Sequence, residues 1–230
     1  AANCFLLRGF PGDYNRLSTQ TQWRTSVTDS LGQVWTPFAS LRGDVASLSI
    51  TNQDNPQTTA PGTVANYLTT GNSTPTRGMA TVGLEYRYPF INVQSWGTQT
   101  IEPIAQVIAR PSEPQIGKWP NEDAQSLIFD DTNLFDWNKF AGWDRVEGGT
   151  RLNAGLHYSW TLGTGQFVSA LFGQSYQLAG RNSYAVPDIS NAGRDSGLQQ
   201  AVSDYVGGVS FQATQNLAFA THFRFDQQTW

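Results

Sequence analysis

The stretch Arg77–Phe90 reads RGMATVGLEYRYPF, and its apolar and polar residues alternate with a period of two. In an extended chain Val82 and Leu84 would lie on one face, and Glu85 and Arg87 on the other. A period of two over this length is typical of a β-strand with one apolar and one polar face. The stretch therefore predicts a strand that separates an apolar environment from a polar one.

The same alternation returns along the rest of the chain, for example in Arg151–Leu162. No segment shows the period of about 3.6 residues that an amphipathic helix requires. We therefore expect an all-β protein with about eight antiparallel strands. The expected strands are Tyr14–Val27, Val34–Leu48, Arg77–Phe90, Ile101–Arg110, Arg151–Leu162, Phe167–Gln177, Ser203–Phe211 and Leu217–Asp226.

Two prolines lie inside these expected strands. Pro37 lies near the start of one strand and Pro103 lies within another. A proline has no N–H group to donate to a neighbouring strand. We therefore expect each proline to mark a bulge or the end of a strand.

The connections between the expected strands alternate between short and long. The short ones are Asp29–Gly32, Ile91–Gly97, Gly163–Gln166 and Thr214–Asn216, and the long polar ones are Thr51–Pro75, Pro111–Gly148 and Gly180–Gln200. Outer-membrane β-barrels have short periplasmic turns and long outer loops, whereas soluble sandwiches usually have shorter connections throughout. The length pattern therefore favours an outer-membrane β-barrel.

Aromatic residues gather on the apolar faces near the short connections. Tyr88, Phe90 and Trp96 flank one short connection, and Tyr158 and Trp160 flank another. An aromatic girdle at the boundary between lipid and water would place them there. The alternative is that these side chains fill the core of a soluble β-sandwich.

The composition excludes several other classes of protein. Aromatic residues make up 13% of the chain, which argues against disorder. The net charge is −4, whereas a general nucleic-acid binder needs a basic surface. The single cysteine, Cys4, cannot form a disulfide within this chain.

The most specific pattern is the stretch Asn133–Gly155, which reads NLFDWNKFAGWDRVEGGTRLNAG. It resembles the barrel of the LptD family, also called the organic solvent tolerance protein family, whose recurring phrase is N-L-F, then N-x-F-x-G-x-D-R, then a glycine and R-L. Further matches extend this resemblance over about Glu102–Trp230, and the earlier residues resemble the family only in texture. The phrase is carried by Asn133, Leu134, Phe135, Asn138, Phe140, Gly142, Asp144, Arg145, Gly149, Arg151, Leu152 and Gly155.

The resemblance implies a translocon that inserts lipopolysaccharide into the outer leaflet of the outer membrane of a Gram-negative bacterium. Its implied partners are lipopolysaccharide, outer-membrane lipid, the plug lipoprotein LptE and the periplasmic bridge protein LptA. Family members have a periplasmic jellyroll domain ahead of a barrel of about 26 strands. We therefore expect residues 1–230 to form about eight strands of one such transmembrane barrel domain, without the jellyroll.

The polar strand faces supply the candidate residues of the barrel interior. These candidates are Glu85, Arg87, Glu102, Arg110, Arg151, Asn153, His157, Asp204, His222, Arg224 and Asp226. Their arginines could bind phosphate groups bidentately, and the alternative is ordinary lumen polarity and packing against the plug lipoprotein. The loop Asn133–Gly149 is too aromatic for a solvated outer loop, so we expect it to fold inward, held by Asp144 and Arg145.

No catalytic or metal-binding constellation is recognisable in the sequence. His157 and His222 have neither a cysteine partner nor metal-ligand spacing, and no G-x-S-x-G elbow is present. We therefore expect no enzymatic activity, no cofactor and no metal. Two alternatives to the translocon stay open, namely a general diffusion porin and a soluble carbohydrate-binding β-sandwich.

Overall fold

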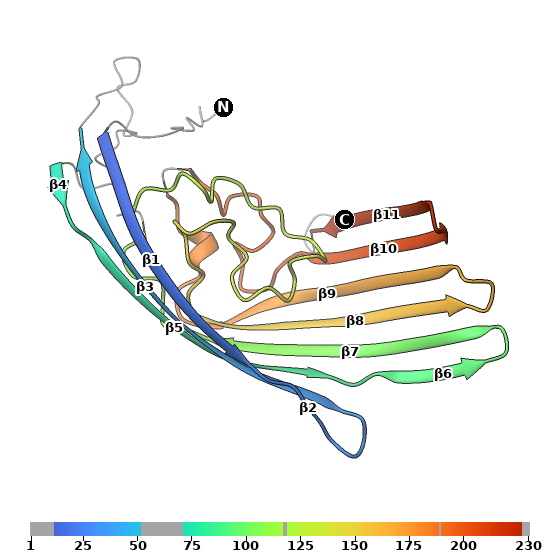
Figure 1. Ribbon diagram of the computed structural model, residues 1–230. Helices are drawn as coiled ribbons and strands as arrows, with labels where there is room; N and C mark the ends of the chain where they lie inside the picture. The colour runs from blue at the N-terminus through green and yellow to red at the C-terminus, as the bar shows by residue number, and fades with distance from the viewer. Residues whose placement is uncertain (1–11, 52–70, 117–118, 189, 227–230) are drawn as a thin grey trace.

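The computed structural model describes residues 12–51, 71–116, 119–188 and 190–226, and these contain one antiparallel sheet (Figure 1). The strands of its main path pair in the order β1-β3-β5-β7-β8-β9-β10-β11, so each long strand lies beside the next one along the chain. These strands are β1 (Gly12–Arg24), β3 (Val34–Ile50), β5 (Thr76–Arg87), β7 (Gly97–Ala109), β8 (Thr150–Leu162), β9 (Phe167–Ala179), β10 (Tyr205–Thr214) and β11 (Leu217–Phe225). Three short strands, β2 (Val27–Thr28), β4 (Gly71–Ser73) and β6 (Phe90–Gln94), and one 3-10 turn, η2 (Ser183–Ala185), complete the described elements.

The sheet is curved, and its hollow side holds the long connections (Figure 1). In the described part of the chain β1 and β11 form the two edges of the sheet and do not pair with each other. The eight strands of the main path confirm the prediction of an antiparallel outer-membrane barrel wall that is part of a larger barrel. No helix among the described residues is long and apolar enough to cross a membrane.

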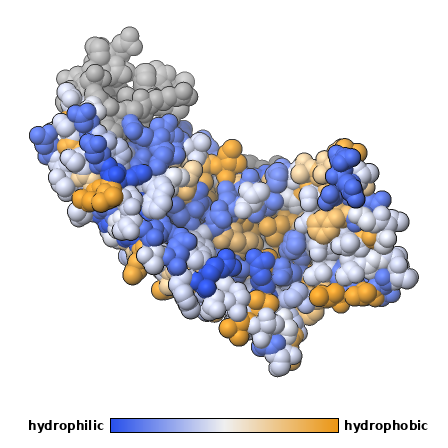
Figure 2. Space-filling view, in the orientation of Figure 1, coloured by the Kyte–Doolittle hydropathy of each residue, from blue (hydrophilic) through white to orange (hydrophobic). Residues whose placement is uncertain are grey.

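The distribution of side chains over the two faces is the reverse of that in a soluble protein. On the convex face, Leu41 is 67% exposed and Leu156 is 48% exposed. On the hollow face, Arg151 and Asn153 are fully buried. A soluble sandwich would bury its leucines against a second sheet, and the described residues form only one sheet. Figure 2 shows many hydrophilic residues over the middle of the view, with hydrophobic groups among them and along the lower edge. The convex face is therefore the lipid-facing side, and the sandwich alternative is excluded.

The prediction that Pro37 and Pro103 mark bulges or strand ends is wrong. Pro37 lies inside β3 and Pro103 inside β7, and the pairing register continues unchanged on both sides of each. The carbonyl oxygen of Pro37 accepts a hydrogen bond from the N–H of Thr25 at 3.2 Å, and that of Pro103 from Tyr88 at 3.2 Å. Neither proline can donate the return bond. The interruption opposite Pro37 separates β1 from β2, and the one opposite Pro103 lies between β5 and β6, where Pro89 also lacks an N–H.

The connections confirm the alternation of short and long with one correction. Ile91–Gly97 is not a loop, because β6 pairs with β7 and leaves only a two-residue turn at Ser95 and Trp96. The other three short connections and the long ones after β7 and β9 lie where the sequence predicts them. The connection Thr51–Pro75 falls largely outside the described residues, as does Cys4.

The aromatic residues near the short connections lie in contact with one another on the outside of the sheet. The rings of Trp96 and Trp160 are 5.7 Å apart between centroids, and those of Trp35 and Tyr86 are 4.6 Å apart. Trp96 is 49% exposed, so it does not fill a core. This arrangement is that of an aromatic girdle at a membrane boundary.

Candidate functional site

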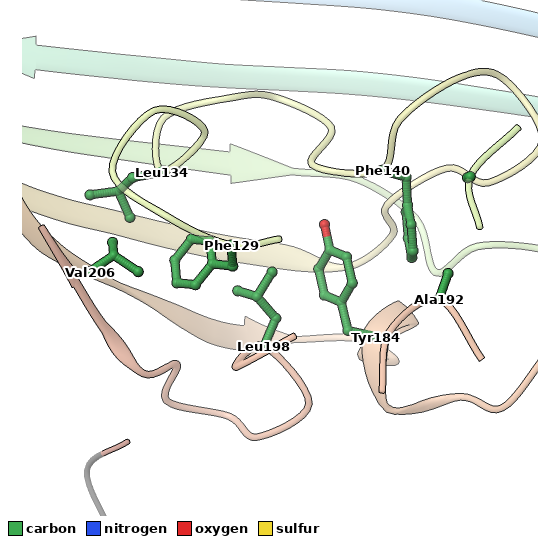
Figure 3. Packing of buried hydrophobic residues seen from close by; sticks show 8 residues of the cluster. Phe129, Leu134, Phe140, Tyr184, Ala192, Leu198 and Val206 are labelled. Atoms are coloured by element: carbon green, nitrogen blue, oxygen red, sulfur yellow. The ribbon is translucent and has the colours of Figure 1, made fainter. Parts of the chain in front are cut away.

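Two long connections, residues 110–149 and 180–204, fold back over the hollow face of the sheet, and we call them together the internal strap (Figure 1). The strap has a hydrophobic core of its own, to which the sheet, among the described residues, contributes only Val206 of β10 (Figure 3). The core consists of Ala124, Phe129, Leu134, Phe140, Tyr184, Ala192, Leu198 and Val206. Residues from both connections form this core, so the strap is a packed unit rather than two solvated loops.

Glycines on the hollow face leave room for the strap to approach the strand backbones. Gly155 of β8 lies opposite Gly173 of β9, and a side chain at Gly173 would overlap with Leu134. The ring of Phe135 would lie 3.1 Å from a side-chain carbon at Gly155. Glycine in a strand often marks such a close approach. The family phrase therefore includes residues of the strap and also Gly155, whose lack of a side chain leaves room for Phe135 to pack on β8.

A buried charge cluster fixes the end of the strap to β8. Oε1 of Glu147 lies 2.7 Å from Nε of Arg151 and 3.2 Å from Nη2 of Arg110. Burial alone would raise the pKa of the Glu147 carboxyl, but Arg110, Lys139 and Arg151 outweigh it and lower the pKa to about 2. Burial lowers the pKa of the Lys139 ammonium to about 8, and the two arginines add to that shift. The Glu147 carboxylate thus lies among three buried cations, and Asp136 also interacts with the ammonium of Lys139.

Asp144 and Arg145 are adjacent in the chain but bind different parts of the molecule. The Asp144 carboxylate accepts hydrogen bonds from the Tyr14 hydroxyl at 2.7 Å and the Glu122 N–H at 2.8 Å, and it pairs with Arg16. Asp144 therefore ties the strap to β1.

Arg145 joins the two halves of the strap to each other. It pairs with Glu113 at 3.3 Å and with Asp188, and it donates a hydrogen bond to the Ser183 carbonyl at 2.9 Å. Burial would lower the pKa of the Arg145 guanidinium, but the carboxylates of Glu113 and Asp188 outweigh it and raise that pKa. Arg145 is therefore held as a cation between the two connections.

A further anchor joins the strap to β3 and β5, and the sequence reasoning missed it. Asp44 and Arg77 lie directly opposite each other in the sheet and form an ion pair of 2.9 Å. Arg77 also donates hydrogen bonds to the carbonyl oxygens of Asp144 at 2.8 Å and Trp143 at 2.9 Å. In the sequence, the alternation places both residues on polar strand faces. Many other residues lie on those faces, so this position alone could not identify the pair.

At the other side of the sheet, β11 holds the strap through two of the candidate residues. Nδ1 of His222 lies 2.7 Å from Oδ1 of Asp131. Arg224 donates hydrogen bonds to the carbonyl oxygens of Ser196 at 2.9 Å and Asp195 at 3.0 Å. The strap is therefore anchored near both edges of the described sheet.

Two of the remaining candidates lie beside the β11 anchor. The carboxylate of Asp204 is 3.3 Å from Nε of Arg224, and burial together with the nearby Asp226 raises its pKa although Arg224 lowers it. Asp226 is exposed and lines a cavity of about 490 Å³ with Asp204 and Arg224.

The other candidates form a polar network across β5, β7 and β8. Arg87 pairs with Glu85 at 2.7 Å and with Glu102 at 3.3 Å, and Nδ1 of His157 is 3.6 Å from Glu102. The Asn153 amide donates a hydrogen bond to the Gln106 side chain, which donates one to Glu85. The described residues contain no group of three or more His, Cys, Asp or Glu side chains placed to hold a metal.

The residues of the family phrase that precede β8 all lie in the strap. Asn138 accepts a hydrogen bond from the N–H of Glu147 at 2.9 Å, and Asn133 donates one to the Ile128 carbonyl at 2.6 Å. Gly142 has a positive φ of 72° and packs against Asp123, where a larger side chain would overlap. Asn133, Asn138 and Gly142 set the conformation of the strap, because these contacts lie within it.

The chain was compared with models of known protein families and with curated proteins. Residues 8–229 match the family model described as LptD, LPS transport system D. A search of curated proteins found no match. The family match covers nearly the whole chain, including residues 8–101, which by inspection resemble the family only in texture. The chain therefore belongs to the LptD family of the lipopolysaccharide transport system.

Proposed function

We propose that this protein is part of an outer-membrane translocon that assembles lipopolysaccharide into the outer leaflet of a Gram-negative bacterium. The observation that carries the proposal is the match of residues 8–229 to the LptD family. The exposed apolar convex face and the polar hollow face support it, because a barrel wall needs the first and passage of a saccharide needs the second. The proposed partners are the plug lipoprotein LptE within the barrel and the bridge protein LptA on the periplasmic side.

Depletion of the protein from its own cells tests this function directly. We expect newly made lipopolysaccharide to accumulate on the inner side of the outer membrane and to disappear from the cell surface. Labelling of its sugars on intact cells measures the amount at the surface. The total amount of an unrelated outer-membrane barrel serves as the control. If the protein were a diffusion porin, its depletion would leave surface lipopolysaccharide unchanged and would reduce the uptake of small solutes. That result would reject the translocon.

We further propose that the internal strap closes this part of the barrel to solutes. Replacing Asn133–Gly149 by a short Gly-Ser linker removes Leu134, Phe140 and Glu147, and with them the strap core and its central ion pairs. We expect the uptake of large antibiotics to rise by at least tenfold and the assembly with the plug lipoprotein to decrease. Minimum inhibitory concentrations and co-purification measure the two effects.

A pair of glycine variants controls for general damage to the sheet. A side chain at Gly208 would overlap with the carboxylate of Asp131, so Gly208→Val should displace the strap from β10. A side chain at Gly78 of β5 would meet no atom within 4 Å. Permeability should therefore increase in Gly208→Val and not in Gly78→Val. Equal permeability in the deletion variant and the unmodified protein would show that the strap is not a barrier.

A further inference from the structure

The strap is packed less closely against β11 than against β9. A cavity of about 420 Å³ lies between strap residues 127–130 and residues 222–224 of β11. At β9, in contrast, the side chain of Leu134 fills the space over Gly173. The strap is therefore joined to β11 by individual polar contacts rather than by a packed interface.

Two polar links join the strap to β11 in the described part of the chain. Arg224 makes the first, through hydrogen bonds to the backbone carbonyls of Asp195 and Ser196. A guanidinium and two carbonyls keep their charge at every physiological pH. The second link is the 2.7 Å contact between Nδ1 of His222 and Oδ1 of Asp131. Histidine is the side chain whose charge ordinarily changes between about pH 5 and pH 8, so the two links respond differently to pH.

Charged groups of both signs surround His222. Asp130 and Asp195 of the strap line the same cavity, as does Arg224 of β11. On the β10 side, the residue opposite His222 is a glycine. Among the described residues, Asp131 is the only charged group within ion-pair distance of the imidazole of His222. The pairing of these two side chains therefore decides whether this link is charged.

Asp131 lies at the tip of the strap nearest to β10 and β11, and we call residues 130–133 the strap tip. The carboxylate of Asp131 occupies the space that a side chain at Gly208 of β10 would need. The residues on either side of the tip, Phe129 and Leu134, are buried in the strap core. Among the described residues, the contact with His222 is the only hydrogen bond or ion pair between the tip and the sheet. The tip can therefore leave the sheet while the core stays intact.

We propose that His222 and Asp131 form a pH-dependent latch that holds the strap tip on β10 and β11. Below the titration range of the histidine, the imidazolium attracts the carboxylate and the tip stays seated over Gly208. As the pH rises through that range the imidazole loses its charge, and the charge-assisted hydrogen bond becomes a weaker neutral one. The tip is then released, while Glu147 and Asp144 keep the rest of the strap on β8 and β1.

The latch goes beyond the proposed function, because it concerns the attachment of the strap to the sheet. It holds whether or not the strap is a barrier to solutes. Release of the tip would widen the cavity between the strap and β11, which is lined by apolar and acidic residues of the strap. The predicted change is therefore confined to one side of the hollow face.

Hydrogen–deuterium exchange of the full-length protein in detergent tests the latch at pH 6 and pH 8, with each rate corrected for the intrinsic effect of pH. The N–H groups of Asp130 and Thr132 are hydrogen-bonded within the tip, so they report on its order. We expect their exchange to be about two- to fivefold faster at pH 8, the range for loss of a partly exposed ion pair. Residues 140–149 are the internal control. A tip that responds to pH no more than this control segment would overturn the proposal.

Three variants assign the response to His222. His222→Gln removes the titratable charge, so the tip should exchange rapidly at both pH values. His222→Lys keeps a positive charge at both, so the tip should stay protected at both. His157→Gln is the matched control, because the other histidine of the chain also lies on the hollow face but is close to Glu102 of β7. This control should respond to pH as the unmodified protein does.

The variants also separate the latch from the titration of Lys139, whose pKa is about 8 and which every variant retains. A pH response of the tip that persists in His222→Gln, or that disappears in His157→Gln, would overturn the latch. Salt gives a second readout, since added salt screens a partly exposed ion pair. Raising the ionic strength at pH 6 should speed exchange in the tip of the unmodified protein and not in that of His222→Gln. Equal effects of salt on both proteins would contradict the ion pair.

Discussion

Replacing Glu147 by Gln should lower the free energy of unfolding of the protein by about 3–5 kcal/mol, the usual cost of breaking a buried ion pair. Gln keeps the size of the side chain but removes the charge that compensates Arg110, Lys139 and Arg151. Denaturant titration of the protein refolded into lipid vesicles measures the change. Glu122→Gln is the control, because Glu122 is exposed in the same strap and its loss should cost less than about 0.5 kcal/mol.

The same carboxylate predicts a pH dependence. The pKa of Glu147 is lowered in the folded state to about 2 from an ordinary value of 4.5. A group with a depressed folded pKa stabilises the protein above its unfolded pKa, and this contribution disappears as the pH falls through the folded value. The unmodified protein should therefore lose stability between about pH 4.5 and pH 2, and Glu147→Gln should show a smaller loss over that window. An identical slope in both proteins would contradict the buried ion-pair assignment.

Replacing Leu156 by Arg should destabilise the protein by about 2–4 kcal/mol, because it would place a charge at the lipid-facing side of the barrel wall. Leu156 lies in the middle of β8 on the convex face and is 48% exposed. Leu84→Arg on β5 should have a comparable effect. Vesicle-based unfolding measures both.

The control for these variants must be chosen from the structure. Alternation alone predicts that Gly83 and Asn153, on the polar face, would tolerate arginine. The structure contradicts this, because a side chain at Gly83 would overlap with Phe38, and Asn153 is fully buried. Ala220 of β11 is exposed and lies on the hollow face, so Ala220→Arg is the suitable control. A penalty as large for Ala220→Arg as for Leu156→Arg would contradict the assignment of the two faces.

The sheet could be predicted from the sequence because its signal is local. The period-two alternation in β5, β8 and β11 fixes both the strand and its faces without knowledge of the rest of the chain. The effect of Pro37 and Pro103 on the strands could not be predicted, because the pairing is interrupted in the strand opposite each proline and not in the strand that contains it. Inward folding of Asn133–Gly149 was predictable from its aromatic content, and burial of Leu134 and Phe140 in the strap core agrees with it.

The anchors of the strap could not be predicted, because they join residues far apart in the chain. Nothing near Asp144 indicates that its partners are Tyr14 and Arg16 on β1. Likewise, Asp131 meets His222 only because β10 and β11 return to the same hollow face. Alternation places a residue on a face, and only the full sheet decides which residues of that face meet.

The span of the strap's contacts determines when it can form during folding. The contact between Tyr14 and Asp144 joins residues 130 positions apart, and that between Asp131 and His222 joins residues 91 positions apart. Hairpins such as β8–β9 involve much shorter separations, and contacts between distant residues form slowly because closing a long segment costs more entropy. The contacts that anchor the strap to β1 and β11 can therefore form only after both edges of this sheet are in place. Until then, the strap has its own core but lacks the contacts that hold it to the two edges, so its position on the hollow face is the last part of this structure to be fixed.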